Sequence, residues 1–194
     1  MLADPVPAVA GGTARFMKFR MGTEIAAHLS AGDHYMTTDQ VRGPRFEYAF
    51  TIALTLGEVY WVKPTTQGST RAAVYVKAGT IEGPDIRGIV IPQSGADWPL
   101  LRPDGVIDFD ARYLLQTDDG TVIYMQNRGF RWGPPEVMAA LSRREPVDPS
   151  AYYMRTAPKF DAPEGPYAWL GRFVFVGVAE KTPTGNSIAY FKVL

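Results

Sequence analysis

The sequence predicts an all-β protein that forms a single antiparallel β-barrel of about eight to nine strands. Many short runs of alternating apolar and polar residues, separated by turn-forming residues, predict the strands. The 19 Gly and 16 Pro residues suit tight turns between them. The chain lacks the strand–helix alternation that is typical of a parallel sheet. A two-sheet sandwich is the alternative, but closure into a barrel removes sheet edges and leaves room for one small ligand.

Period-two alternation locates the strands along the chain. In residues 46–55, large apolar side chains alternate with smaller or polar ones, which indicates a half-buried strand. Turn signals such as Pro103-Asp104-Gly105 and Pro183-Thr184-Gly185 separate the later runs. The further expected strands are 58–63, 71–81, 85–92, 106–117, 121–129, 151–156, 168–180 and 187–194.

The hairpin around Asp118-Asp119-Gly120 has a register that its side chains determine. The odd-numbered residues of 107–115 are apolar and are expected to face the interior. A three-residue loop pairs odd-numbered residues of the two strands, and Gly120 can adopt the left-handed backbone that such a loop needs. Asn127 then lies opposite Ala111, and Tyr113 lies opposite Met125. A lone amide on this apolar inner face either satisfies a buried backbone group or binds a ligand.

Two helices are expected beside the strands. Pro134-Pro135 suits the first turn of a short helix near 134–144, and apolar residues recur every four positions within a second candidate helix at 14–31. We expect residues 1–35 to form a partly flexible N-terminal extension and residues 45–194 to form the barrel domain. The N-terminal helix is a candidate for self-association, so a homodimer is one expectation.

Composition excludes several classes of function. The 20 basic and 20 acidic residues cancel, so no basic field is available for nucleic acid or an anionic membrane surface. The chain has no cysteine, no apolar run long enough to span a membrane and no secretory signal pattern. We therefore expect a cytoplasmic protein whose partner is a small hydrophobic ligand or substrate.

Metal, nucleophile and cofactor chemistry are not expected. The only histidines are His28 and His34, and both lie in the N-terminal extension, at a spacing that does not aim them at one ion. Neither lies near a serine in a strand-to-helix elbow, and the chain has no phosphate loop or dinucleotide fingerprint.

Acid–base chemistry remains, with Asp97, Tyr113 and Asn127 as the candidate catalytic residues. Asp97 lies in Gly95-Ala96-Asp97-Trp98, where the apolar Trp98 would raise its pKa if the site is dry. Tyr113 and Asn127 are candidates to hold a developing oxyanion. The alternatives are that Asp97 fixes its own loop, that Tyr113 is a core aromatic, and that Asn127 is structural.

Arg155, Tyr153, Trp169, Trp98 and Met125 are the candidate substrate-binding residues. Arg155 shares a strand face with Tyr153 and would bind an anionic group if it were buried. The alternative is an outward salt bridge of Arg155 to Asp110. Trp169 is expected at the start of the last long strand, where it would form the pocket floor or pack in the core.

Several strings resemble the bacterial and fungal family called domain of unknown function 3237. The resemblance covers roughly residues 46–180, and the motifs are specific in combination. It implies a single barrel that is similar in shape to calycin-like or allene-oxide-cyclase-like barrels, with no general activity assigned. The chain departs from the family pattern at Gly171, where Asn is common, and at Ser94, where Gly is common. The strings are AGTIEGPDIRG (78–88), SGADWPLLRPDG (94–105), DARYLLQTDDGTVIYMQNRG (110–129), GPPEV (133–137), DPSAYYMRTAPKF (148–160) and YAWLGR (167–172).

The leading functional hypothesis is a cofactor-independent isomerase, cyclase or lyase that acts on a small apolar carbonyl compound. In it, Asp97 moves a proton, Tyr113 and Asn127 steady the enolate oxygen, and Trp169 packs on the substrate. The alternatives are a non-catalytic binding or carrier barrel for a hydrophobic ligand, and a structural protein whose N-terminal helix drives oligomerisation.

Overall fold

A computed structural model describes residues 42–194 of the chain. Residues Gly43–Leu194 form one compact unit. The N-terminal extension 1–35, with its expected helix at 14–31 and both histidines, lies outside the described residues. In the described part of the chain, no helix is long and apolar enough to cross a lipid bilayer.

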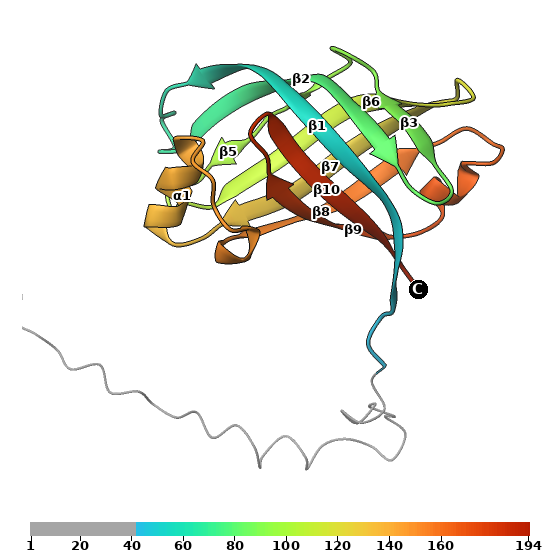
Figure 1. Cartoon of the computed structure of the whole chain (residues 1–194). Helices are drawn as coiled ribbons and strands as arrows, with labels where there is room; N and C mark the ends of the chain where they lie inside the picture. The colour runs from blue at the N-terminus through green and yellow to red at the C-terminus, as the bar shows by residue number, and fades with distance from the viewer. Residues whose placement is uncertain (1–41) are drawn as a thin grey trace, which may run out of the picture. The chain divides into compact units, whose positions relative to one another are not determined.

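The described chain is built almost entirely of strands (Figure 1). One α-helix lies between the seventh and eighth strands, and two 3₁₀ turns flank the eighth. The elements are β1 Phe46–Val62, β2 Thr70–Glu82, β3 Arg87–Val90, β4 Ala96–Asp97, β5 Leu100–Leu101, β6 Ile107–Thr117, β7 Val122–Trp132, α1 Pro135–Ser142, η3 Pro149–Ala151, β8 Tyr153–Asp161, η4 Ala168–Gly171, β9 Phe175–Lys181 and β10 Gly185–Val193.

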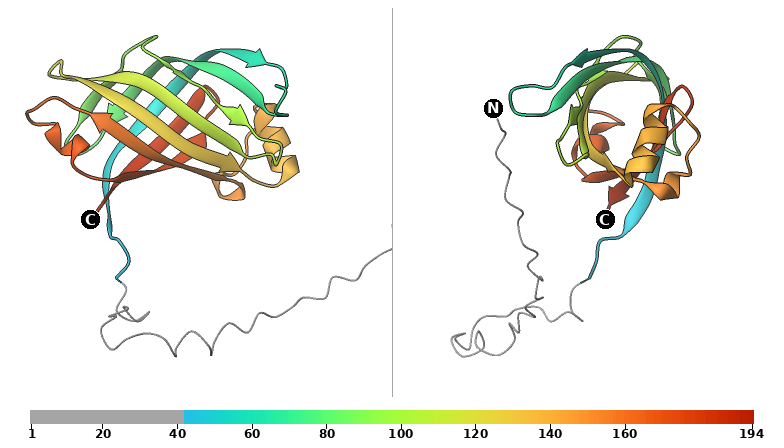
Figure 2. Two further views of the ribbon diagram at one scale, coloured as in Figure 1. Left: turned by 180° about the vertical axis from the view of Figure 1, so that it is seen from behind. Right: turned by 90° about the vertical axis from the view of Figure 1, so that its left-hand side faces the viewer.

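The strands close into an antiparallel barrel, as predicted. The short strands β3, β4 and β5 share one place, because each of them pairs with both β2 and β6. The barrel therefore has eight strand positions, and the pairing of β1 with both β2 and β10 closes it. Each strand lies beside its neighbours in sequence, which needs no long crossover. The end-on view in Figure 2 shows the ring, with α1 at one end of it.

The register predicted for the central hairpin is confirmed. Ala111 pairs with Asn127 and Tyr113 pairs with Met125. Gly120 has a φ of 86°, and its N–H donates to the carbonyl of Thr117, so the three-residue loop forms as expected. The odd-numbered side chains of β6 and β7 face inward as one continuous surface.

Other strand predictions were partly wrong. Residues 46–55 and 58–63 form a single long strand, β1, because bulges near Leu56 let the chain bend without a turn. The strand expected at 168–180 begins only at Phe175, since residues 168–171 form η4. The helix expected near 134–144 is α1.

One half of the barrel is packed with aromatic side chains. The ring of Phe50 lies 5.2 Å from that of Tyr190, between centroids, and the ring of Phe160 lies 5.3 Å from that of Phe175. Trp169 in η4 packs on Phe175 at 5.8 Å. The chain between β8 and β9, which contains η4, lies at the end of the barrel away from α1 (Figure 1), so these aromatic contacts belong to that end.

The Tyr190 side chain can pack over the neighbouring strand β9 because the residue opposite it there is Gly177. A Cβ atom at position 177 would come within 2.8 Å of the Tyr190 ring and 2.2 Å of the Thr156 hydroxyl. Thr156 is the partner of Gly177 on β8. The missing side chain thus lets a tyrosine from β10 reach the middle of the lumen.

Gly177→Ala is expected to destabilise the protein by about 1–3 kcal/mol, because the added methyl group overpacks the space under Tyr190. Urea unfolding followed by tyrosine and tryptophan fluorescence measures the change. Gly171→Ala is the matched control, since its Cβ atom would meet nothing nearer than 3.6 Å and should shift stability by less than about 0.5 kcal/mol. Equal stability of the two variants would contradict this account of the core.

Candidate functional site

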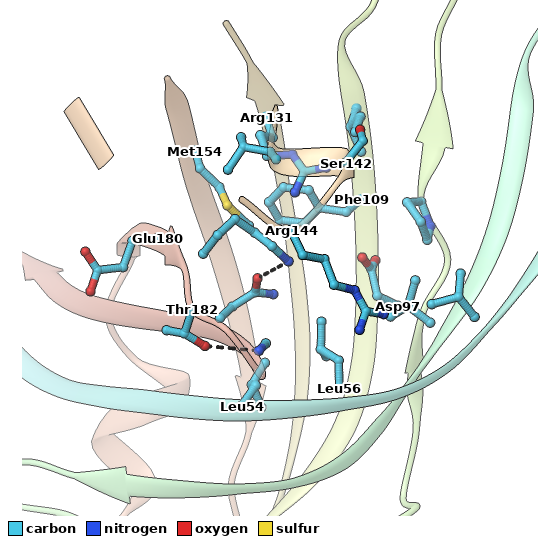
Figure 3. A pocket seen from close by; sticks show the side chains of 18 of the residues that line it. Leu54, Leu56, Asp97, Phe109, Arg131, Ser142, Arg144, Met154, Glu180 and Thr182 are labelled. Carbon is cyan, nitrogen blue, oxygen red and sulfur yellow. Dashed lines mark hydrogen bonds between the residues drawn. The ribbon is translucent and has the colours of Figure 1, made fainter. Parts of the chain in front are cut away.

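The half of the barrel beneath α1 is hollow. A pocket of about 1170 Å³ lies there, bordered by α1, the turn after it and the inward faces of the strands. Apolar side chains form most of its wall, including Leu54, Leu56, Phe109 and Met154 (Figure 3). Apolar walls with a few polar groups are typical of sites for small organic molecules.

Asp97 enters this pocket from β4, a strand of only two residues. It pairs with Ala111 on β6, and Ala111 pairs in turn with Asn127 on β7. The three residues therefore form one row across the wall, and the Cα atoms of Asp97 and Asn127 are about 10 Å apart, or two strand spacings. Because Ala111 has a small side chain, the space between the carboxylate and the amide is open to the lumen.

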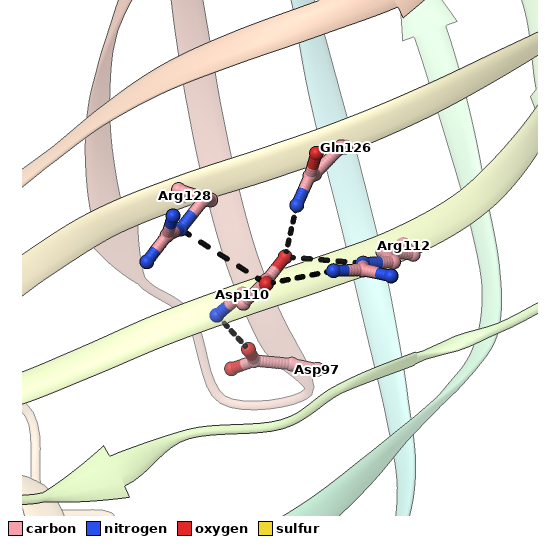
Figure 4. A network of polar contacts seen from close by, with 5 residues as sticks. All are labelled: Asp97, Asp110, Arg112, Gln126 and Arg128. Atoms are coloured by element: carbon pink, nitrogen blue, oxygen red, sulfur yellow. Dashed lines mark hydrogen bonds and ion pairs between the residues drawn. The ribbon is translucent and has the colours of Figure 1, made fainter.

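The environment of Asp97 favours its neutral form. Burial raises the pKa of the Asp97 carboxyl to about 7, although the N–H groups of Asp110 and Trp98 and the charge of Arg131 each act to lower it. The N–H of Asp110 donates to Asp97 Oδ1 at 3.1 Å (Figure 4). The carboxyl thus bonds to the backbone of the neighbouring strand β6, where the alternative had placed the bond within its own loop, and it also lines the pocket.

On the outside of the barrel, the Asp110 side chain forms a separate polar network. It accepts from Gln126 at 2.9 Å and from Arg112 at 3.1 Å, with Arg128 at 4.0 Å (Figure 4). Burial acts to raise the pKa of Asp110, but the hydrogen bonds and charges of these neighbours hold it below its ordinary value. The two adjacent carboxylates thus have opposite shifts, because one faces the lumen and the other faces arginines.

Asn127 and Tyr113 line the deep end of the pocket, and Tyr190 lies beside them in the core. Asn127 is buried, and its Nδ2 donates to the Tyr190 hydroxyl at 2.9 Å. Asn127 Oδ1 and the Tyr113 hydroxyl have no hydrogen-bond partner among the described residues. The Tyr113 and Thr156 hydroxyls lie close enough to Tyr190 to affect the pKa of its phenol, but they do not meet hydrogen-bond geometry. Burial raises the pKa values of Tyr113 and Tyr190, so both stay neutral donors.

Arg131 belongs to the site, and the sequence analysis missed it. It lies on β7, two inward-facing positions beyond Asn127 toward α1, and its Nε atom is buried without a partner. Burial lowers its pKa, opposed by the nearby Tyr152 and Asp97. The sequence does indicate its position, because the alternation that places the odd-numbered residue Asn127 inward continues to position 131.

Two more cations border the pocket near its mouth. Lys181 ends β9, and its Nζ lies 2.8 Å from Asn186 Oδ1. Burial, together with the charges of Arg131 and Arg144, lowers the pKa of Lys181 to about 8, while Asp97 opposes the shift. Arg144 follows α1 and projects into the same space as Asp97 and Arg131 (Figure 3).

The substrate-binding roles predicted for Tyr153 and Arg155 are wrong in position. Both side chains are on the outer surface of β8, while Tyr152, Met154 and Thr156 face inward. The Arg155 guanidinium lies 5.3 Å from the centroid of the Tyr153 ring and donates to the carbonyl of Met154. Asp110, the salt-bridge partner considered for Arg155, bonds to other arginines.

The other three predicted binding residues also lie outside the pocket wall. Trp98 is 52% exposed, because it follows the inward-facing Asp97 in a strand and must point the opposite way. Trp169 lies in η4 within the packed half of the barrel. Met125 is fully buried in the core, one inward position below Asn127. Of the eight predicted site residues, Asp97, Tyr113 and Asn127 line the pocket.

The described residues contain no group of three or more His, Cys, Asp or Glu side chains arranged to hold a metal ion. The polar groups that line the pocket include the Asp97 carboxyl, the Asn127 amide, the Tyr113 phenol and the cationic side chains of Arg131 and Lys181. They can transfer protons, donate hydrogen bonds and bind negative charge.

Sequence and structure comparisons place similar proteins in bacteria and fungi. The chain is 39% identical over 135 residues to UPF0311 protein RPA1785 of Rhodopseudomonas palustris, a match over 70% of this chain and 87% of that protein. The crystal structure of a conserved protein of unknown function from that species has a TM-score of 0.74 at 36% identity, and the match covers 79% of this chain and 99% of the other.

A fungal enzyme is a more distant relative. The chain is 27% identical over 150 residues to the hydroalkoxylation enzyme phnH of Penicillium herquei, a match over 77% of this chain and 84% of that protein. The crystal structure of an enzyme from the same fungus has a TM-score of 0.60 at 25% identity, covering 79% and 97% of the two chains.

The resemblance seen in the sequence motifs is confirmed over nearly the whole described barrel. Residues 44–193 match the family described as protein of unknown function DUF3237, and the chain belongs to this family.

Proposed function

We propose that the protein is a cofactor-independent isomerase, cyclase or lyase that moves a proton on a small, largely apolar carbonyl compound bound in the barrel. The observation that carries this proposal is the Asp97 carboxyl, which has a pKa of about 7. It lines the same pocket as the Asn127 amide and the Tyr113 hydroxyl, and that hydroxyl has no hydrogen-bond partner among the described residues. A carboxyl with this pKa is present in both protonation states at neutral pH, which suits a group that takes a proton and returns it.

The reaction begins when the Asp97 carboxylate removes a proton from the substrate carbon next to a carbonyl group. The electron pair moves onto the carbonyl oxygen, which becomes an enolate. The Tyr113 hydroxyl donates a hydrogen bond to this oxygen, and Asn127 offers the second N–H of its amide beside it. Asp97, now neutral, returns the proton to another carbon or oxygen atom of the substrate, so no oxidant or reductant is consumed.

The fungal relative supports this class of reaction. Hydroalkoxylation adds the O–H group of an alcohol across a carbon–carbon double bond, which moves one proton and forms one C–O bond without net oxidation. The enzyme of that name shares this fold family. Within one molecule, the reaction closes a ring and is an isomerisation, which is the class that the site of this chain supports.

A non-catalytic carrier is the second candidate. The volume of the pocket and its apolar wall favour it, since these features alone would hold a hydrophobic ligand. Native mass spectrometry of the protein purified from its own host identifies any retained molecule. It also gives the oligomeric state and so tests the possible homodimer. A retained molecule without an acidic proton or an unsaturated bond would favour the carrier over the enzyme.

Asp97→Asn is expected to lower turnover of the molecule so identified by about 10²–10⁴-fold and to change its Kd little, because the amide keeps the shape of the carboxyl but transfers no proton. In the parent protein, kcat/KM should rise with pH and level off above about pH 7, as Asp97 ionises. Steady-state kinetics from pH 5.5 to 9 measure both quantities.

Asp161→Asn, a change at the exposed end of β8, serves as the control and should keep the parent activity and pH profile. An Asp97→Asn variant that retains full turnover would assign the proton transfer to another group. A catalysed reaction whose kcat/KM does not change with pH near pH 7 would also assign the proton transfer to another group.

Asp97→Asn is also expected to stabilise the protein at high pH. The folded-state pKa of Asp97 lies above its unfolded value of 3.8, so the stability that the neutral carboxyl confers is lost as pH rises toward and through about 7. The advantage of the variant over the parent should therefore grow by about 2 kcal/mol between pH 5 and pH 8.5. Urea unfolding at the two pH values measures it.

Asp110→Asn provides a comparison of opposite sign, because the pKa of Asp110 is lowered and its charged form is the favoured one. This variant should be no more stable than the parent at pH 8.5. If Asp97→Asn gained nothing between pH 5 and pH 8.5, the carboxyl would not be held in a dry site.

A further inference from the structure

Arg131 is a half-buried cation that lines the pocket and has no anionic partner among the described residues. Its Nε–H is completely buried and finds no oxygen acceptor, and none of the ion pairs among residues 42–194 includes Arg131. Leaving a charged donor buried and unpaired is unfavourable, because the hydration that it loses is not replaced. Proteins keep such a group where a ligand supplies the missing charge, since a guanidinium binds a carboxylate through two parallel hydrogen bonds.

Other positive charges around Arg131 make this part of the pocket favourable for an anion. Lys181 and Arg144 border the same space, and the charges of Arg131 and Arg144 each disfavour the charged form of Lys181. Glu145 and Glu180 also border the mouth, but both are exposed, and Glu145 pairs with Arg143 at 2.6 Å. Asp97 is the one carboxyl of the pocket lining that is not exposed, and it shares the interior with Arg131 and Lys181, while the exposed Arg144 reaches in from the mouth.

The position of Arg131 separates anion binding from the reacting groups. Arg131 lies four residues beyond Asn127 along β7, which corresponds to about 13 Å between their Cα atoms. Gly129, the inward position between them, adds no side chain to the lumen. A molecule can thus extend along the wall from the Asp97–Asn127 row to Arg131, past the apolar surfaces of Phe109 and Met154.

We propose that the substrate is an apolar carboxylic acid whose carboxylate binds the Arg131 guanidinium, while its reactive carbon lies deeper in the barrel beside Asp97. Lys181 and Arg144 add positive charge around the carboxylate and favour its entry from the mouth. The inference rests on the proposed function, because it names the class of molecule on which the same site acts.

The test compares a carboxylate with a neutral molecule of the same length. The neutral fluorophore N-phenyl-1-naphthylamine reports occupancy of the apolar pocket, and decanoate and 1-decanol compete for it. For the parent protein, we expect decanoate to displace the fluorophore at a concentration at least tenfold lower than 1-decanol does. Arg131→Gln should abolish that preference and leave the affinity for the fluorophore within about twofold.

Arg155→Gln is the matched control, because Arg155 lies on the outer surface and should keep the full preference for decanoate. Arg131→Lys retains the charge without the paired donors and should keep part of the preference, and Lys181→Gln should reduce it less than Arg131→Gln does. These two variants keep the test decisive if Arg131→Gln fails to fold, which circular dichroism will show.

Two results would overturn the inference alone: equal displacement by decanoate and 1-decanol, or a preference that survives Arg131→Gln. In both cases the fluorophore still binds, and the proposed acid–base function of Asp97 stands. Failure of the fluorophore to bind the parent protein would instead remove the apolar pocket on which both proposals depend.

Discussion

A barrel with eight strand positions has an interior just wide enough for its own side chains to fill. In this protein, side chains fill only one half of that interior. Aromatic rings around Phe50 and η4 pack the far end, and the end beneath α1 holds a pocket instead. The packed half supplies the apolar burial that a stable fold needs. The open half can therefore hold buried polar groups such as Asp97 and Arg131, which contribute nothing to core packing.

Asp97 and Arg131, both in the lumen, affect each other's pKa without forming an ion pair. Asp97 and Arg131 interact through the pocket, and each acts against the shift that burial imposes on the pKa of the other. A direct contact would satisfy both groups and block the space between them. The strand register keeps them at different levels of the wall, so that neither residue satisfies the other and the space between them stays open.

The sequence predicted the barrel and its central hairpin because alternation and one turn glycine were enough to place Asn127, Ala111 and Tyr113. It failed where local pattern does not decide which face is inside. Tyr153 and Arg155 share one face of β8, and the residue types on its two faces do not show which face is inside. Only the pairing of β8 with β7 places Tyr153 and Arg155 outside. Trp169 looked like a strand residue because its 3₁₀ turn has no distinctive signal. Arg131 lies beyond the strand expected at 121–129, because β7 continues to Trp132.

Ala111 lies in the row between the carboxyl of Asp97 and the amide of Asn127, and its methyl group sets the free width at that level. Each methylene added there would narrow the lumen between the two polar groups, with no effect on the charges around it. The size of residue 111 therefore sets the free volume of the barrel at this level independently of its chemistry.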